Sequence, residues 1–126
     1  MSLLKQILLM SLFSFLFNAN AQHKSSIKVL EVSQFKQEIA KESVQLIDVR
    51  TLKEYEAGHI HHAVNIDYFD QANFEKKINR FDKNKPVYLY CKSGNRSGKA
   101  AAILNGLGFQ EIYDLKGGFM AWQNAE

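Results

Sequence analysis

The sequence predicts an α/β domain built around a largely parallel sheet. Short apolar runs alternate along the chain with segments that carry apolar residues at helical spacing. This alternation is typical of strand–helix–strand units. Two of the runs, VQLI (44–47) and VYLY (87–90), are almost continuously apolar, as expected of strands that helices cover on both faces. A chain of 126 residues has room for one compact domain with a modest core.

The first 21 residues are predicted to be a signal peptide. Lys5 precedes an apolar run from Ile7 to Phe17, and the small-residue triplet Ala19-Asn20-Ala21 follows. This order is typical of a secretory signal with an A-x-A cleavage site, and cleavage is expected before Gln22. An uncleaved anchor is disfavoured, because the run is shorter than the ~20 apolar residues that span a bilayer. We therefore expect an exported protein, periplasmic or secreted, whose mature form is free of the membrane.

Residues 22–26 are a short polar lead-in, and residues 27–126 form the predicted domain. Its first unit is a strand in IKVLEV (27–32), followed by a helix for which Ser33 is the expected N-cap.

The second unit is a strand in VQLIDV (44–49) followed by a short helix in TLKEYEAG (51–58). Thr51 and Glu54 have the spacing of a capping box, which predicts where this helix begins. Gly58 suits a left-handed residue at its end.

The remaining elements continue the alternation. Pro86 stands at a strand start, where its missing N–H does least harm. In order, the expected elements are a strand at 63–67, a helix at 70–81, a strand at 87–91, a helix within 96–109 and a strand at 111–115.

The only cysteine of the chain, Cys91, ends the predicted strand at 87–91. Ligand sites of open parallel sheets lie at the carboxyl ends of the strands, so the thiol occupies the expected position of a site. An oxidising compartment favours disulfides, and this thiol has no partner within the chain. It is therefore either a buried, inert cysteine or one kept for chemistry.

The loop CKSGNRS (91–97) has features that stabilise a thiolate. It leads into a predicted helix, whose first N–H groups and dipole favour negative charge. Gly94 and Gly98 allow close backbone approach, and Lys92 and Arg96 supply positive charge. Together these features predict a lowered pKa for Cys91 and a reactive sulfur.

Most of the chain, from about Val32 to Trp122, resembles the rhodanese-like sulfurtransferases, and three motifs carry the resemblance. LIDVRTLKEYEAGHI (46–60) resembles the aspartate-x-arginine strand end and glycine-histidine-isoleucine segment of that family. CKSGNRS is similar to its cysteine-x4-arginine active-site loop, and LKGGFMAW (115–122) resembles its closing signature. The resemblance implies a three-layer sandwich with a mostly parallel central sheet and helices on both faces.

By this resemblance, Cys91 attacks the outer sulfur of a small anionic donor such as thiosulfate and holds it as a persulfide. The acceptor, cyanide or a thiol, comes from outside the chain, because no second cysteine is present. No cofactor or metal is implied, and a monomer is expected. The resemblance assigns substrate binding to Lys92, Ser93, Gly94, Asn95 and Arg96, and a supporting role to Asp48, Arg50 and Ser97.

Several expectations concern how these residues act. Asp48 and Arg50 are expected to support the loop through hydrogen bonds or an ion pair with Glu54. Lys92 and Arg96 are expected to extend outward, toward the anionic donor.

The closing segment carries further expectations. Gly117 and Gly118 are expected to form a tight turn that brings the segment to the site. Phe119 and Trp122 are expected to pack in the core or against loops rather than to touch a ligand.

Histidines 59, 61 and 62 form a cluster in GHIHHA, but a metal site is disfavoured. In an extended segment His61 and His62 would point to opposite faces. The rhodanese-like family usually has proline and glycine near these two positions, so the histidines are departures that leave the turn geometry open. His62 at the rim of the site is one interpretation.

Other functions stay open beside the sulfurtransferase. Related folds use a cysteine–arginine loop for phosphate, although the six-residue span from Cys91 to Arg96 is one residue shorter than those loops. A module that carries persulfides or docks a partner without catalysis is another alternative, and a cysteine–histidine hydrolase is disfavoured because no protease signature surrounds Cys91. With 16 basic and 13 acidic side chains and no block of like charge, the chain does not predict a nucleic-acid partner.

Overall fold

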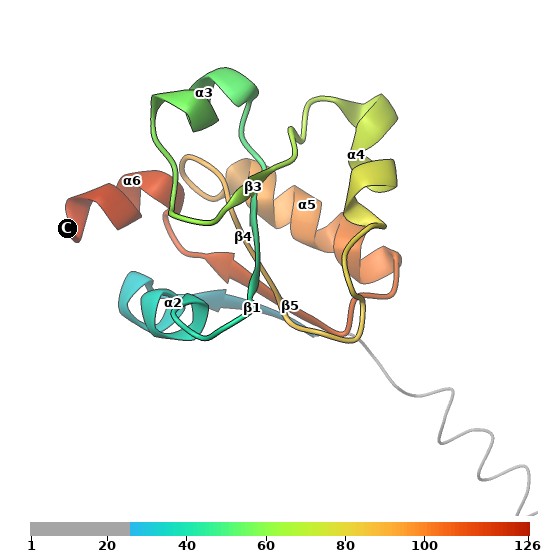
Figure 1. The fold of residues 1–126 in the computed structure, drawn as a ribbon, viewed down its shortest axis with the longest axis horizontal. Helices are drawn as coiled ribbons and strands as arrows, with labels where there is room; N and C mark the ends of the chain where they lie inside the picture. The colour runs from blue at the N-terminus through green and yellow to red at the C-terminus, as the bar shows by residue number, and fades with distance from the viewer. Residues whose placement is uncertain (1–25) are drawn as a thin grey trace, which may run out of the picture.

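The computed structural model describes residues 26–126, so the predicted signal peptide lies outside the described residues. These residues form a five-stranded sheet in the order β1-β5-β4-β2-β3, and every strand pair is parallel. The fold therefore confirms the predicted parallel sheet (Figure 1). The strands are β1 (Ser26–Leu30), β2 (Gln45–Asp48), β3 (Val64–Asn65), β4 (Val87–Tyr90) and β5 (Glu111–Leu115).

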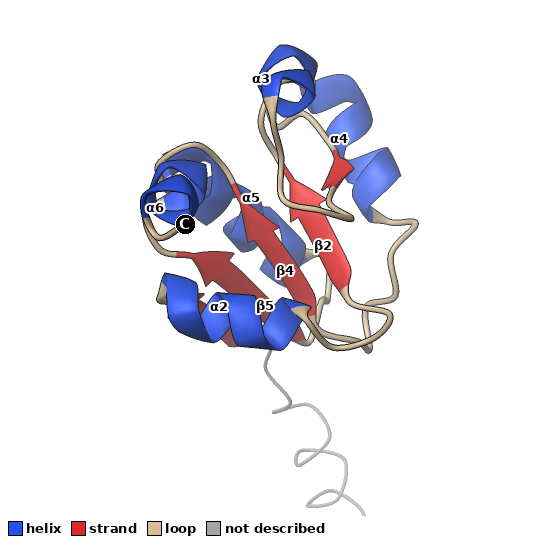
Figure 2. Ribbon diagram, turned by 60° about the vertical axis from the view of Figure 1, so that its left-hand side comes forward, coloured by secondary structure: helices blue, strands red, loops and turns tan. Residues whose placement is uncertain are grey.

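Helices cover both faces of the sheet, as predicted. The helices are α2 (Val32–Ile39), α3 (Leu52–Ala57), α4 (Gln71–Ile78), α5 (Asn95–Gly106) and α6 (Gly118–Asn124). In Figure 2, α2 lies in front of the sheet and α5 lies behind it. Side chains of α4 and α5 pack into one apolar cluster, and side chains of α2 and α6 pack into another.

The two clusters lie on opposite faces of β4, which explains why its sequence is apolar throughout. Val87 and Leu89 belong to the cluster beneath α5, and Tyr88 and Tyr90 belong to the cluster beneath α2. Neighbouring residues of a strand point to opposite faces, so a strand covered on both sides has no position for a solvated side chain. All four residues of β4 are buried.

Several of the predicted boundaries are wrong. The strand predicted at 63–67 is only Val64–Asn65, and the helix predicted at 70–81 is only Gln71–Ile78. Helix α2 begins at Val32, with Glu31 rather than Ser33 in the N-cap position. Strand β1 stops at Leu30 because its partner strand β5 stops at Leu115. Leu30 and Leu115 are the last pair in the register of the two strands.

The predicted capping box of α3 is confirmed, since Thr51 and Glu54 each accept a hydrogen bond from the other's backbone. Gly58 was expected to be left-handed, but its φ and ψ of 153° and 140° lie outside the left-handed helical region, at a positive φ that residues with a side chain rarely adopt. Its carbonyl accepts a hydrogen bond from the Arg50 guanidinium, 2.7 Å away, and this contact directs the chain away from the helix.

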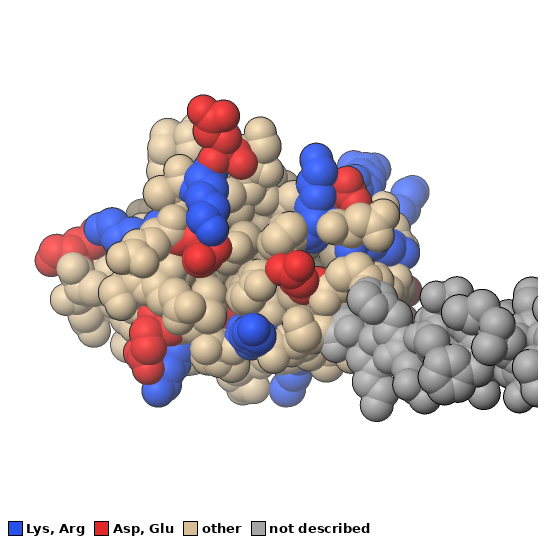
Figure 3. Space-filling model, turned by 90° about the horizontal axis from the view of Figure 1, so that it is seen from below, with Lys and Arg blue, Asp and Glu red and all other residues tan. Residues whose placement is uncertain are grey.

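On the face shown in Figure 3, Lys and Arg side chains are interspersed with Asp and Glu. No helix among residues 26–126 is both long and apolar enough to cross a bilayer.

Candidate active site

The predicted site residues meet at one end of the sheet, beyond the carboxyl ends of β2, β4 and β5. Cys91 directly follows β4, and the loop 91–94 connects it to α5. The segment after β2 carries Arg50, and the turn after β5 leads into α6. The carboxyl ends of parallel strands lie at the same end of the sheet, so these segments come together although they are far apart in the sequence.

The sulfur of Cys91 is nearly enclosed, because the residue is only 1% exposed. The backbone N–H of Gly94 donates a hydrogen bond to Sγ over 3.1 Å, and the hydroxyl of Ser97 lies 3.4 Å from Sγ. Burial alone would raise the pKa of the thiol. Hydrogen bonds from the Ser97 hydroxyl and from the amides of Ser97, Gly94 and Ser93 outweigh burial, and the pKa of Cys91 is lowered. The loop thus stabilises the thiolate, as its sequence predicts.

Gly94 is the residue whose backbone makes this geometry feasible. Its φ of 112° is one that residues with a side chain rarely adopt. It also occupies the N-cap position of α5, so the first turn of that helix starts directly beside the sulfur.

The start of α6 holds the loop from the other side. The amide of Phe119 donates to the carbonyl of Cys91 over 2.8 Å, and the amide of Met120 donates to the carbonyl of Lys92 over 3.0 Å. Gly117 and Gly118 have φ of 74° and 62°. A Cβ on Gly118 would lie 2.5 Å from the carbonyl oxygen of Cys91, so only glycine permits this approach. The predicted tight turn is confirmed.

Arg96 does not extend outward as expected. Its guanidinium forms two hydrogen bonds with the carboxylate of Glu54, 2.7 and 3.0 Å long, and lies 5.3 Å from the ring centroid of Phe69. A two-pronged pair of this kind fixes the orientation of the guanidinium. Lys92, by contrast, is exposed, and no salt bridge within residues 26–126 involves it.

The pair with Arg96 makes Glu54 the acid-sensitive group of the site. Hydrogen bonding to Arg96 lowers the pKa of Glu54 to about 2, although partial burial opposes the change. A carboxylate with a depressed folded-state pKa stabilises the fold above its unfolded pKa, and that contribution is lost as the pH falls through the folded value.

We therefore expect Glu54→Gln to destabilise the protein by about 1 kcal/mol at pH 7, allowing for solvent screening, and by clearly less at pH 3. Urea unfolding at the two pH values measures this, with Glu56→Gln on the exposed side of α3 as the control. An equal loss at both pH values would contradict the assignment.

Asp48 and Arg50 form a buried network with each other rather than with Glu54, which corrects the expected partner. The guanidinium of Arg50 binds the Asp48 carboxylate over 2.7 to 3.1 Å, and the two residues are 4% and 0% exposed. The hydroxyl of Tyr90 donates to Asp48 over 2.6 Å and accepts the amide of Ile60 over 3.0 Å.

The Arg50 guanidinium also lies 4.3 Å from the ring centroid of Phe119. Through that contact the network reaches the start of α6, which in turn binds the cysteine loop. Asp48 and Arg50 thus support the loop at one remove, and Tyr90 is a member of the network that the sequence analysis did not identify. The alternation of β4 signals only that Tyr90 is buried, not what its hydroxyl binds.

The other predicted residues fall into two groups. Ser97 is fully buried. It was expected to support the loop indirectly, but its hydroxyl contacts the sulfur of Cys91 directly. Ser93 and Asn95 are exposed beside Lys92 on the open side of the loop. Phe119 and Trp122 pack against the apolar cluster beneath α2, as expected.

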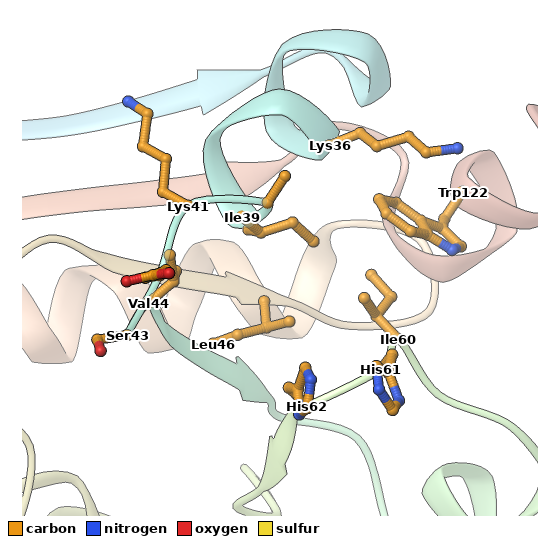
Figure 4. Close-up of a pocket in the computed structure, with 12 residues that line it drawn as sticks. Lys36, Ile39, Lys41, Ser43, Val44, Leu46, Ile60, His61, His62 and Trp122 are labelled. Atoms are coloured by element: carbon orange, nitrogen blue, oxygen red, sulfur yellow. The ribbon is translucent and has the colours of Figure 1, made fainter.

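The two neighbouring histidines, His61 and His62, lie in a turn before β3. His62 adopts a left-handed φ of 71° in a turn, so the segment is not extended, and the rings of His61 and His62 lie side by side, 3.9 Å apart. Both line a surface pocket of about 650 Å³ with Lys36, Ile60 and Trp122 among its walls (Figure 4).

No residue of the loop 91–97 lines this pocket, and His62 at the rim of the site stays a prediction. Within residues 26–126 no three metal-binding side chains come together.

Comparison with known proteins agrees with this geometry. The model of the rhodanese-like domain family matches residues 31–125. The thiosulfate sulfurtransferase GlpE of Shewanella oneidensis is 38% identical over 101 residues, which cover 80% of this chain and 97% of GlpE.

Two further relatives differ in how much they cover. A Bacillus subtilis protein named "Uncharacterized protein YqhL" is 49% identical over 78 residues, which cover 62% of this chain and only 60% of that protein. The crystal structure of a rhodanese-like domain protein from Staphylococcus aureus superposes with a TM-score of 0.67 at 30% identity, over 75% of this chain and 90% of the other.

Proposed function

We propose that this chain, which belongs to the rhodanese-like domain family, is a sulfurtransferase that carries sulfane sulfur on Cys91. The observation that carries the proposal is the environment of the sulfur. A buried thiol whose pKa is lowered by backbone amides and by Ser97 is built for nucleophilic attack. The GlpE relative is named a thiosulfate sulfurtransferase, which supports thiosulfate as the first donor to test.

The chemistry requires only the thiolate and the loop. The thiolate attacks the outer sulfur of thiosulfate, the sulfur–sulfur bond of the donor breaks, and sulfite leaves with the bonding electron pair. The acceptor, cyanide or a thiolate, then attacks the outer sulfur of the Cys91 persulfide, and the cysteine leaves as a thiolate. The backbone N–H groups that face the sulfur stabilise the negative charge at both steps.

The charges of the loop divide into two roles in this proposal. Lys92 is exposed and outside any ion pair of the described domain, so it attracts the anionic donor. Arg96 is paired with Glu54, so its main effect is to hold the start of α5 in place. Ser93 and Asn95, on the open side of the loop, contact the donor, and Gly94 supplies its N–H.

The test is the intact mass of the protein after exposure to thiosulfate and removal of excess reagent. We expect the gain of one sulfur atom, and loss of that sulfur with formation of thiocyanate when cyanide is added. A protein that gains sulfur but does not turn over with cyanide is a carrier rather than a transferase. A protein that gains no sulfur from thiosulfate or another sulfane donor contradicts the proposal.

We also propose that the protein works outside the cytoplasm. The support is the apolar run and the Ala19-Asn20-Ala21 triplet near the amino terminus. The expected result is that exported protein begins at Gln22, which amino-terminal sequencing of material from the periplasm or medium measures. Material that starts at Met1, or that stays with the cytoplasmic fraction, would contradict export.

A further inference from the structure

Asp114, the fourth residue of β5, is a buried carboxylate for which the proposed reaction has no role. The residue is 5% exposed, and its Oδ1 accepts no hydrogen bond from the described residues. A buried carboxylate without full hydrogen bonding costs stability, so its presence in a sheet calls for a reason.

The register of the sheet places Asp114 beneath the start of α5. It pairs with Leu89 of β4, two residues before Cys91, and it lies on the same face as Ile112, which packs against α5. The buried stripe of α5 begins with Ser97, and hydrogen bonding by Ser97 is the influence that lowers the pKa of Asp114 against the effect of burial. Ser97 therefore lies between a buried acid and the reactive sulfur.

The hydroxyl of Ser97 has one proton and three acceptors in reach. It donates to the carbonyl of Gly94 over 3.3 Å, it lies 3.4 Å from Sγ, and its hydrogen bonding lowers the pKa of Asp114. A thiolate is stabilised only when the proton points at sulfur. An ionised Asp114 competes for that proton, whereas a protonated Asp114 donates its own proton to the Ser97 oxygen and leaves the hydroxyl free for sulfur.

We propose that Asp114 is a positioning residue that acts through the Ser97 hydroxyl and controls how strongly the Cys91 sulfur is stabilised as a thiolate. The inference deepens the proposed function, on which its biological meaning rests, but it concerns the thiolate alone and is testable without a sulfur donor.

The charges around this relay are few. Burial raises the pKa of Asp114 to about 6, with the Ser97 contact as the only opposing influence, so no charged side chain of β1, β4, α2 or α5 contributes. Near the sulfur, the charged groups are Lys92, which directly follows Cys91, Arg96, and Asp67, which acts on Arg96. The partner of Arg96, Glu54, has a pKa of about 2 and stays ionised throughout the range in question. Asp114 is therefore the group that changes charge between pH 5 and pH 7, and its ionisation raises the pKa of Cys91.

The experiment measures the alkylation rate of Cys91 by iodoacetamide from pH 5 to pH 10 at constant ionic strength. The proteins are the parent, Asp114→Asn, Ser97→Ala and the double variant. Asparagine keeps the shape of the aspartate, remains neutral and donates a hydrogen bond. We expect Asp114→Asn to lower the midpoint of the profile, so that about three- to tenfold more thiolate is present at pH values between 6 and that midpoint.

The double variant separates positioning from a structural role. In the Ser97→Ala background the effect of Asp114→Asn is expected to fall to less than about twofold, because the hydroxyl that connects the two groups is absent. Asp82→Asn, an exposed carboxylate before β4 at the opposite end of the sheet, is the control and is expected to leave the profile unchanged. If Asp114→Asn fails to fold, Asp114→Ser supplies a second neutral variant.

An unchanged profile for the neutral variants would overturn the inference, and so would an equal change with and without the Ser97 hydroxyl. These outcomes are distinct from a failure of the proposed function. A protein that shows the predicted alkylation profiles but gains no sulfur from sulfane donors would support the positioning role of Asp114 and contradict the proposed sulfurtransferase function.

Discussion

Replacement of Cys91 by serine is expected to eliminate sulfur transfer, with turnover from thiosulfate to cyanide reduced by at least about a thousandfold. The serine hydroxyl is not ionised at neutral pH and is a poor nucleophile toward sulfur, so no persulfide forms. Intact mass spectrometry is expected to show a sulfur adduct on the parent protein and none on Cys91→Ser. Steady-state formation of thiocyanate measures the same loss.

The fold of this variant is expected to survive, which makes the result interpretable. Serine is close to cysteine in size, and its oxygen can accept the Gly94 N–H that now binds Sγ. The melting temperature and the circular dichroism of Cys91→Ser serve as controls. Turnover close to that of the parent in a folded Cys91→Ser protein would remove Cys91 from the mechanism.

Removal of the Asp48 carboxylate is expected to have the largest effect on stability, about 3–5 kcal/mol for Asp48→Ala. The substitution leaves the Arg50 guanidinium buried without its counter-charge, and it also removes the acceptor of the Tyr90 hydroxyl. Trp122 is the only tryptophan of the chain, so its fluorescence during urea unfolding measures the loss.

An exposed ion pair provides the matched control. Lys116 and Glu31 lie 3.1 Å apart with side chains 65% and 69% exposed, and Glu31→Ala is expected to cost less than about 1 kcal/mol. If Asp48→Ala cost no more than Glu31→Ala, the buried network would not be a major support of the site. Replacing both Asp48 and Arg50 by hydrophobic residues is expected to recover part of the stability that Asp48→Ala loses, because the double replacement leaves no unpaired charge in the core.

Much of the site was readable from local sequence because its parts are local. The thiol, the loop glycine and the start of the helix fall within seven consecutive residues, so the environment of Cys91 follows from the loop and helix geometry. The capping box of Thr51 and Glu54 was predicted for the same reason, since its two hydrogen bonds join residues three apart.

The errors share a different cause. Glu54 was expected to partner Arg50, but its carboxylate meets Arg96, 42 positions along the chain. Arg50 has a nearer partner in Asp48, which shares its strand end. Several basic and acidic side chains lie at this end of the sheet. Which of them form ion pairs depends on the direction of each side chain and on the order in which the strands are connected. Neither can be read from the order of residues along the chain.

The sequence by itself determined the class of fold, the order of its elements and the identity of the thiol, because these follow from hydrophobic periodicity, turn chemistry and one unpaired cysteine. The tertiary structure decided the partners of the buried polar groups: Tyr90 on Asp48, the α6 amides on the carbonyls of the cysteine loop, and Asp114 beneath Ser97. The physical reason is that a buried polar group must find its partner in space, and a parallel sheet brings strand ends together from segments dozens of residues apart.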